Sequence, residues 1–122
     1  MVVVKIDSFV RGLHVYKVKL KPQDQLYLTL CRWWMRVHQD AEEDHMRYSV
    51  AVKDLHHHDR VVGHIAIEDS FNIGRRIEMG YIVDISIVGL RSFRQETPNL
   101  VTGELEDKGL VHECVLTYDE FI

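Results

Sequence analysis

Three consecutive histidines, His56–His58, precede Asp59 and are the most conspicuous side chains in this sequence that could do chemistry. Imidazole and carboxylate groups bind zinc or copper when several of them converge on one ion. Neighbours in a tight connection can supply two such ligands but rarely three. We therefore favour a solvent-exposed connection between two strands, and we expect no metal and no cofactor.

The serine and cysteine residues lack the surroundings of a catalytic nucleophile. No serine lies in a G-x-S-x-G motif, and the sequence contains no phosphate-binding glycine-rich loop. Cys31 and Cys114 have no metal-binding spacing, and each lies in or beside an apolar run. We therefore predict buried, reduced thiols, an intracellular protein (nuclear or cytoplasmic), and no enzymatic activity.

The segment from Arg11 to Lys21 combines cationic side chains with an aromatic ring. Its lysines alternate with Tyr16, Val18 and Leu20, and a period of two is typical of a half-buried strand. Cations that hold phosphates beside a ring that stacks on a base are the composition of single-stranded nucleic-acid surfaces. The same alternation places Tyr16 opposite the lysines, so a solvated lysine face with a core tyrosine is the other interpretation.

Trp33 and Trp34 are adjacent, and successive side chains of a strand point to opposite faces. Only one ring can enter the core if the strand continues through both. The other ring either covers the acidic stretch that follows or forms a contact surface for a partner, nucleic acid or protein.

The charge is unevenly distributed along the chain. The net charge is −4, but residues 1–36 contain seven Lys or Arg against two acidic residues, a net charge of +5. Residues 37–72 then carry −5 and residues 73–122 carry −4. A basic first third in an acidic protein indicates that an anionic partner would bind there.

Length and composition bound the elements that must position these residues. At 122 residues, with 46% hydrophobic and 28% charged residues, the chain is predicted to be one globular domain, 1–122. No apolar run is long enough to span a bilayer, and we expect no signal peptide and no membrane partner.

The apolar periodicity predicts strands joined by turns and one short helix. A helix over Ile67–Met79, capped by Asp69 or Ser70, follows from the change of period there. Loops are expected over 36–47 and 92–108. Strands are predicted over Val2–Ile6, Leu13–Leu20, Leu26–Leu30, Tyr48–Lys53, Arg60–Ile65, Tyr81–Val88 and His112–Tyr118.

Two of these predictions concern the packing of the strands. Leu13–Leu20 and Leu26–Leu30 are expected to pair antiparallel. Tyr81–Val88 is expected to be buried on both faces except at Asp84 and Ser86. The elements together predict a mainly β (α+β) fold, a small OB-like curled β-barrel of six or seven strands with one short helix.

Short motifs follow one another from about residue 8 to 118: VRGLHVYK at Val10–Lys17, YSVAVK at Tyr48–Lys53, VVGHI at Val61–Ile65, the strand end at Val83–Arg91, and GLVHECVLT at Gly109–Thr117. Taken together in this order, they resemble the HIRAN domain, and free-standing members of that family most of all.

The resemblance implies an OB-like barrel that binds single-stranded DNA and captures a free 3′ end. It implies that Tyr16 stacks on a base, that His14 contacts a phosphate with Lys17 beside it, and that an acid accepts from the end hydroxyl. The family's second aromatic is Val15 here, and the nearest acid to its expected position is Asp44. The family's basic turn after Val-Gly-His is acidic here, at Ala66–Asp69.

The predicted function is therefore that of a non-catalytic nucleic-acid-binding domain, for single-stranded DNA or DNA ends. The alternative is a protein-interaction module on the same fold, using Trp33 and Trp34 and lacking DNA binding. The candidate nucleic-acid-binding residues are Arg11, His14, Tyr16, Lys17, Asp44 and Phe93.

Overall fold

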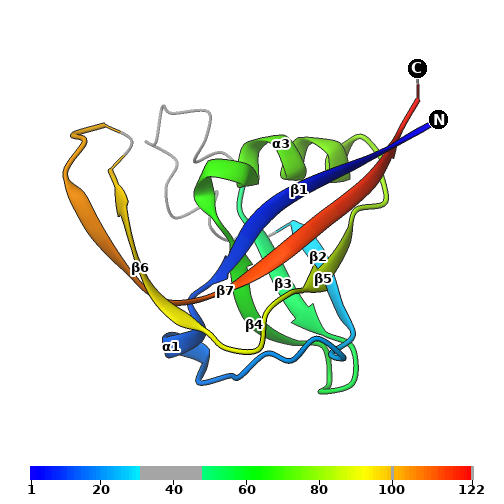
Figure 1. Cartoon of the computed structure of the whole chain (residues 1–122). Helices are drawn as coiled ribbons and strands as arrows, with labels where there is room; N and C mark the ends of the chain where they lie inside the picture. The colour runs from blue at the N-terminus through cyan, green and yellow to red at the C-terminus, as the bar shows by residue number, and fades with distance from the viewer. Residues whose placement is uncertain (31–47, 100, 122) are drawn as a thin grey trace.

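The computed structural model describes residues 1–30, 48–99 and 101–121. The strands and helices in this part of the chain follow one another as shown in Figure 1. They are β1 (Val2–Arg11), α1 (Leu13–Tyr16), β2 (Leu26–Leu30), β3 (Val50–Asp54), β4 (Arg60–Ile65), α3 (Ile67–Glu78), β5 (Asp84–Ile87), β6 (Phe93–Pro98) and β7 (Leu105–Glu120).

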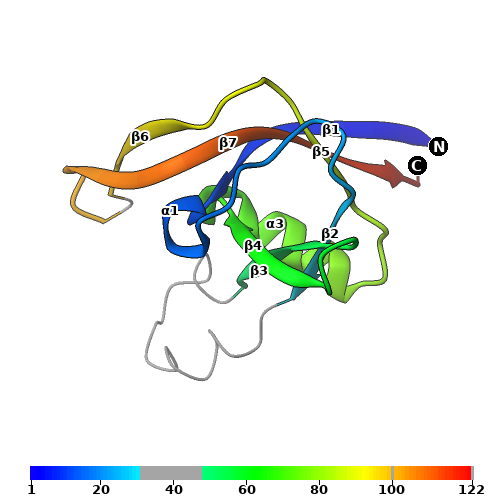
Figure 2. The same cartoon turned by 90° about the horizontal axis from the view of Figure 1, so that it is seen from below.

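The strands form one antiparallel sheet with the order β2-β3-β4-β1-β7-β5, and β6 also pairs with β7. β2 and β5, at the two ends of this order, contact each other, so the sheet curls into a nearly closed barrel (Figure 2). The prediction of a mainly β curled barrel is confirmed.

The longest pairing joins the two ends of the chain. β1 runs antiparallel to β7 from Val2 opposite Glu120 to Arg11 opposite Val111, which places the termini side by side (Figure 1). Alternate residues of β1 then face the barrel interior, where Val10 is fully buried and Val4 and Ile6 pack against the core.

The core lies between the sheet and α3. Val50, Val62 and Leu116 are fully buried on three different strands, and Ile73 brings the apolar face of α3 against them. Complete burial of a side chain of this size stabilises the folded state by roughly 1.5–3 kcal/mol. Cys114 is buried in the same core, as predicted, whereas Cys31 lies outside the described residues.

The prediction of a strand over Leu13–Leu20 is wrong. Gly12 has a φ of +88°, a conformation that glycine adopts without strain, and it turns the chain into the single helical turn α1. Lys17, with a φ of +56°, ends that turn, and the segment does not pair with Leu26–Leu30. β2 pairs with β3 instead, although Leu13 and Leu20 still enter the core.

The loop predicted over 92–108 is also wrong, because it contains β6 and the beginning of β7. These strands form a hairpin that extends away from the barrel (Figure 1). The final strand therefore begins at Leu105 and not at His112. Most residues of β6 are exposed, and apolar residues near the tip are too: Val101 is 70% and Leu105 68% exposed.

Smaller corrections concern β5 and the start of α3. β5 covers only Asp84–Ile87, and Ile82 is 81% exposed, so Tyr81–Val88 is not buried on both faces. Ala66, and not Asp69 or Ser70, occupies the N-cap position of α3. The boundaries of β2 and β4 agree with the prediction, and the helix over Ile67–Glu78 ends one residue earlier than expected. Among the described residues, no helix is both long and apolar enough to cross a membrane.

Candidate functional site

A pocket of about 520 Å³ lies where α1, β3, β4 and the first turn of α3 meet. Its aromatic lining consists of Tyr16, Tyr48 and His64, and its cations are Arg11 and Lys108. The remaining lining is aliphatic or carries a hydroxyl: Ser49, Ala51, Val61, Ile65, Ile67 and Ser70. The pocket is therefore mainly apolar, with polar groups at a few positions, which is the usual character of a ligand site.

Tyr16 reaches this pocket because the chain turns at Gly12. The turn makes Tyr16 the last residue of α1, half-buried, with its ring centroid 5.9 Å from that of His64 and the planes inclined by 39°. A strand at this position, as the sequence predicts, would direct the tyrosine ring along the sheet normal into the core. The helical turn instead leaves one side of the ring at the pocket.

His64 is held beside Tyr16 by strand pairing. It lies on β4 directly opposite Arg11 of β1, which fixes the position of its backbone relative to the pocket. Burial lowers the pKa of His64 below its ordinary value of 6.5. The imidazole is therefore neutral near neutral pH, and it presents one hydrogen-bond donor and one acceptor.

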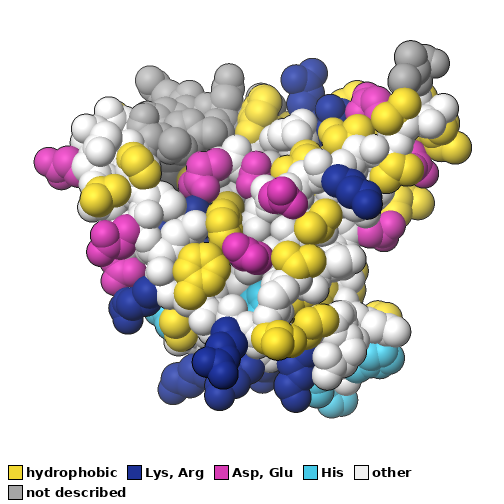
Figure 3. Space-filling view, in the orientation of Figure 1, with side chains coloured by type: hydrophobic (Ala, Val, Ile, Leu, Met, Phe, Trp, Pro, Cys, Tyr) yellow, Lys and Arg dark blue, Asp and Glu magenta, His cyan; other side chains and the backbone are white. Residues whose placement is uncertain are grey.

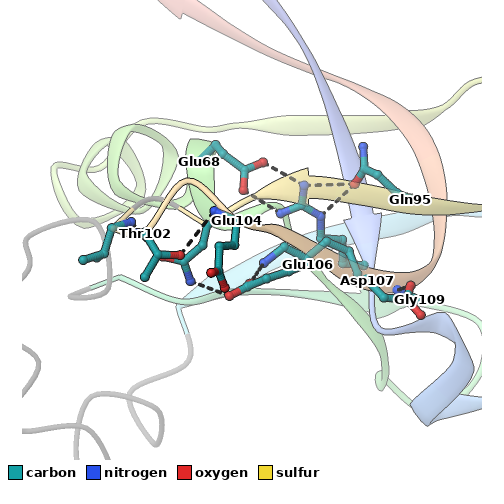
Figure 4. A network of polar contacts seen from close by, with 11 residues as sticks. Glu68, Gln95, Thr102, Glu104, Glu106, Asp107 and Gly109 are labelled. Atoms are coloured by element: carbon teal, nitrogen blue, oxygen red, sulfur yellow. Dashed lines mark hydrogen bonds and ion pairs between the residues drawn. The ribbon is translucent and has the colours of Figure 1, made fainter.

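Arg11 is bound on two sides by polar groups of α3 and β6 (Figure 4). Its Nη1 and Nη2 donate to the two carboxylate oxygens of Glu68 at 2.7 and 2.8 Å, and its Nε and Nη2 donate to Oε1 of Gln95 at 3.0 and 2.9 Å. Burial opposes ionisation of Glu68, but the hydrogen bonds and charge of Arg11 outweigh it and hold the pKa of Glu68 below its ordinary value. The positive charge of Arg11 is thus compensated before any ligand binds.

Lys108 is compensated in the same way. Its Nζ donates to Glu106 at 2.9 Å, and Glu106 also accepts a short hydrogen bond from Asn99 (Figure 4). Since the two cations that the described residues contribute to the pocket have acidic partners, these cations attract a phosphate only weakly. A flat, neutral and partly aromatic group fits this lining better than a phosphate does.

The structure brings together two of the predicted site residues, Arg11 and Tyr16. The His14 ring lies against the backbone of Gly109 in β7, where no side chain could be accommodated beside it, and not in the pocket. Lys17 is exposed at the end of α1, and Phe93 packs edge to face on Phe9 of β1 with a centroid distance of 5.9 Å.

The predictions for Asp44 and for the pair Trp33 and Trp34 fall outside the described residues.

Sequence reasoning missed Tyr48, His64 and Lys108 as members of this pocket. Tyr48 stands two residues before β3, and a ring at the start of a buried strand is a signal that could have drawn attention to it. His64 and Lys108 give no such signal. They approach the pocket only because β4 pairs with β1 and because β7 contacts α1.

The histidine-rich connection between β3 and β4 makes ordinary polar contacts. The Nε2 of His56 lies 2.7 Å from Oε1 of Gln25, and His57 lies 3.7 Å from a carboxylate oxygen of Asp54. Over the described ranges, no group of three or more His, Cys, Asp or Glu side chains is arranged to hold a metal ion.

No protein-family model, no curated protein and no solved structure matches this chain.

Proposed function

We propose that this protein is a non-catalytic domain that binds single-stranded nucleic acid, with an unpaired base held in the pocket between Tyr16 and Tyr48. The observation that carries the proposal is the lining of this pocket. Two tyrosine rings and a neutral histidine border a recess of about 520 Å³ whose cations already have acidic partners.

A nucleobase matches this lining in shape and polarity. One of its faces stacks on the half-buried ring of Tyr16, and a stacked base contributes roughly 1–3 kcal/mol to binding. Its edge carries donors and acceptors that suit the neutral ring of His64 and the hydroxyl of Ser49. A base that is already paired in a duplex cannot enter such a recess, which favours single strands and strand ends.

The resemblance to the HIRAN domain supports the same side chain by an independent route. It assigns base stacking to Tyr16, which lies in the pocket, and it extends the proposal to the ends of single-stranded DNA. The proposal includes a location inside the cell, nuclear or cytoplasmic, where such a partner occurs. The free, buried thiol of Cys114 is compatible with that location, since reduced cysteines are usual inside the cell.

The test is binding of a fluorescently labelled single-stranded oligonucleotide, followed by anisotropy at about 50 mM salt. Tyr16→Ala is expected to lose roughly 1–3 kcal/mol of binding free energy through the lost stack. Tyr27→Ala is the matched control, because Tyr27 is a half-buried tyrosine on β2 that does not line the pocket. Equal losses in the two variants would contradict the assignment of Tyr16.

Salt dependence and a strand-end comparison complete the test. Because backbone phosphates contribute, affinity is expected to fall as salt rises. Oligonucleotides with a free or a blocked 3′ hydroxyl separate end capture from internal binding. Absence of binding at about 50 mM salt would overturn the proposal and favour the protein-interaction module, for which Trp33 and Trp34 are the first residues to substitute.

A further inference from the structure

A second recess, of about 330 Å³, opens at a different place on the barrel, and we call it the basic cleft. It is lined by Lys19 and Leu20 of the α1–β2 connection, by Leu90, Arg91 and Ser92 of the β5–β6 connection, and by His112 of β7. Figure 3 shows Lys and Arg side chains gathered along the lower edge of the molecule, where α1 and the connection after it lie in Figure 1.

The cations of the basic cleft are uncompensated, unlike those of the pocket lined by Tyr16 and Tyr48, which we call the tyrosine pocket. Lys19 and Arg91 are both exposed, and neither has an acidic partner within the described part of the chain. No Asp or Glu of the described ranges lines the cleft. A guanidinium and an ammonium group beside a serine hydroxyl are groups that bind oxyanions.

His112 adds a buried polar atom that has no partner. The residue is only 1% exposed, and its Nε2 lies 2.9 Å from the backbone carbonyl oxygen of Gly89. Because a carbonyl oxygen can only accept, Nε2 carries the proton, and in the neutral ring Nδ1 is an acceptor. Among the described residues Nδ1 has no hydrogen-bond partner, a situation that is costly for a buried polar atom.

We propose that the basic cleft binds a phosphate group that retains one protonated oxygen, as free phosphate or as a terminal phosphate. Its charged oxygens accept from Lys19, Arg91 and the Ser92 hydroxyl. Its P–OH group donates to Nδ1 of His112. Because Nδ1 has less than 1 Å² of accessible surface, this hydrogen bond requires a small shift of the side chains that cover the imidazole when phosphate binds. Carboxylate and sulfate have no proton to donate near neutral pH. Phosphate is therefore the one of these three anions that can satisfy every polar group that lines the cleft.

The proposal is tested by titrating the protein with inorganic phosphate while chloride keeps the ionic strength constant. Saturable NMR shifts are expected for the backbone amides of Leu20 and Ser92 and for the ring nitrogens of His112. Sulfate is expected to bind at least about threefold more weakly, because it cannot make the hydrogen bond to Nδ1. Equal affinity for the two anions would overturn the assignment of His112.

Arg91→Gln is expected to reduce affinity for phosphate about tenfold or more, because it removes a charge-assisted hydrogen bond. Lys21→Gln is the matched control, since Lys21 is an exposed lysine of the same connection that does not line the cleft. Both substitutions are at exposed side chains, so folding is retained. Shifts that are absent in the wild-type protein, or that weaken equally in both variants, would overturn the proposal.

Oligonucleotides with and without a terminal phosphate distinguish the two sources of the ligand. If the phosphate belongs to a strand end, the phosphorylated oligonucleotide binds more tightly and Arg91→Gln abolishes the difference. If Arg91→Gln weakens the binding of inorganic phosphate but leaves the affinity for the phosphorylated oligonucleotide unchanged, the cleft is a site for free phosphate. Tyr16→Ala is expected to leave phosphate binding unchanged, so failure of the tyrosine pocket and failure of the basic cleft are observed separately.

Discussion

The tyrosine pocket and the basic cleft both contain arginine and histidine, yet their chemistry differs. In the pocket, Arg11 is bound by Glu68 and Gln95, and the neighbouring rings create a surface for a flat neutral group. In the cleft, Arg91 has no acidic partner among the described residues, and Leu20 and Leu90 take the place of the tyrosine rings. A cation is available to a phosphate only if its charge is not already paired with an acid, so its presence in the sequence does not decide whether it binds one.

The difference originates in the elements that carry the two arginines. Arg11 is the last residue of β1, and strand pairing places it beside the first turn of α3, where Glu68 is located. Arg91 belongs to the connection between β5 and β6, which adjoins no described helix in the sequence. Glu68, in the acidic segment Ala66–Asp69 where the resemblance expects a basic turn, therefore neutralises Arg11, and Glu106 of β7 neutralises Lys108.

The largest expected effect comes from separating β4 from β1, the two strands that carry His64 and Arg11. In Gly63→Ala, the new Cβ would lie 2.6 Å from the backbone oxygen of Arg11 and 2.6 Å from Cγ1 of Val10. Forcing β4 away from β1 is expected to lower the free energy of unfolding by about 1–3 kcal/mol, measured by chemical denaturation. Gly103→Ala, where a Cβ would meet nothing within 4 Å, is expected to cost less despite its φ of +76°.

A smaller effect is expected from leaving Arg11 of the tyrosine pocket without its acidic partner, as Arg91 is in the basic cleft. Glu68→Gln removes the charge that compensates Arg11, so affinity for a single-stranded oligonucleotide is expected to rise by roughly 0.5–1 kcal/mol at low salt. Its salt dependence should become steeper, because one more cation is available to a phosphate. Glu96→Gln, the same change of charge at an exposed residue of β6, serves as the control. An equal rise in both variants would show a general effect of net charge.

The smallest effect concerns the protonated and neutral forms of His64. Since burial lowers the pKa of His64, NMR titration is expected to show it protonating at a lower pH than 6.5, the ordinary value. The unfolded chain then binds this proton more readily than the folded one, so the contribution of His64 to stability is complete above about pH 6.5 and falls as the pH decreases below it. A titration midpoint above 6.5 would contradict the burial described for the pocket.

Much of the barrel could be predicted because half-buried strands leave a clear period of two in the sequence. Leu26–Leu30 carries that signal, Arg60–Ile65 is predicted as the partner strand after a hairpin connection, and the structure has strands with the same boundaries. The β6–β7 hairpin could not be found in this way. It projects away from the core and is mostly exposed, so no apolar alternation distinguishes its strands from a loop.

The segment after Gly12 shows the opposite error. Its apolar and polar side chains alternate in the sequence, but the structure has no strand there. Val18 and Leu20 pack toward the core from a connection, and Tyr16 reaches the pocket from a helical turn. The stacking candidate Tyr16 and its neighbour Arg11 could be selected from residue types alone. Their convergence with Tyr48, His64 and Lys108 depends on long-range pairing, which local patterns do not encode.

β7 belongs to the barrel at one end and to the hairpin at the other. Between Cys114 and Thr117 it is paired on both sides, with β1 and with β5. From Leu105 to Leu110 its only strand partner in the described part of the chain is β6. Backbone amides exchange with solvent through local openings at a protein's periphery and through global unfolding in its core. One continuous strand therefore contains amides that exchange when the hairpin alone opens and amides that exchange only when the whole barrel unfolds.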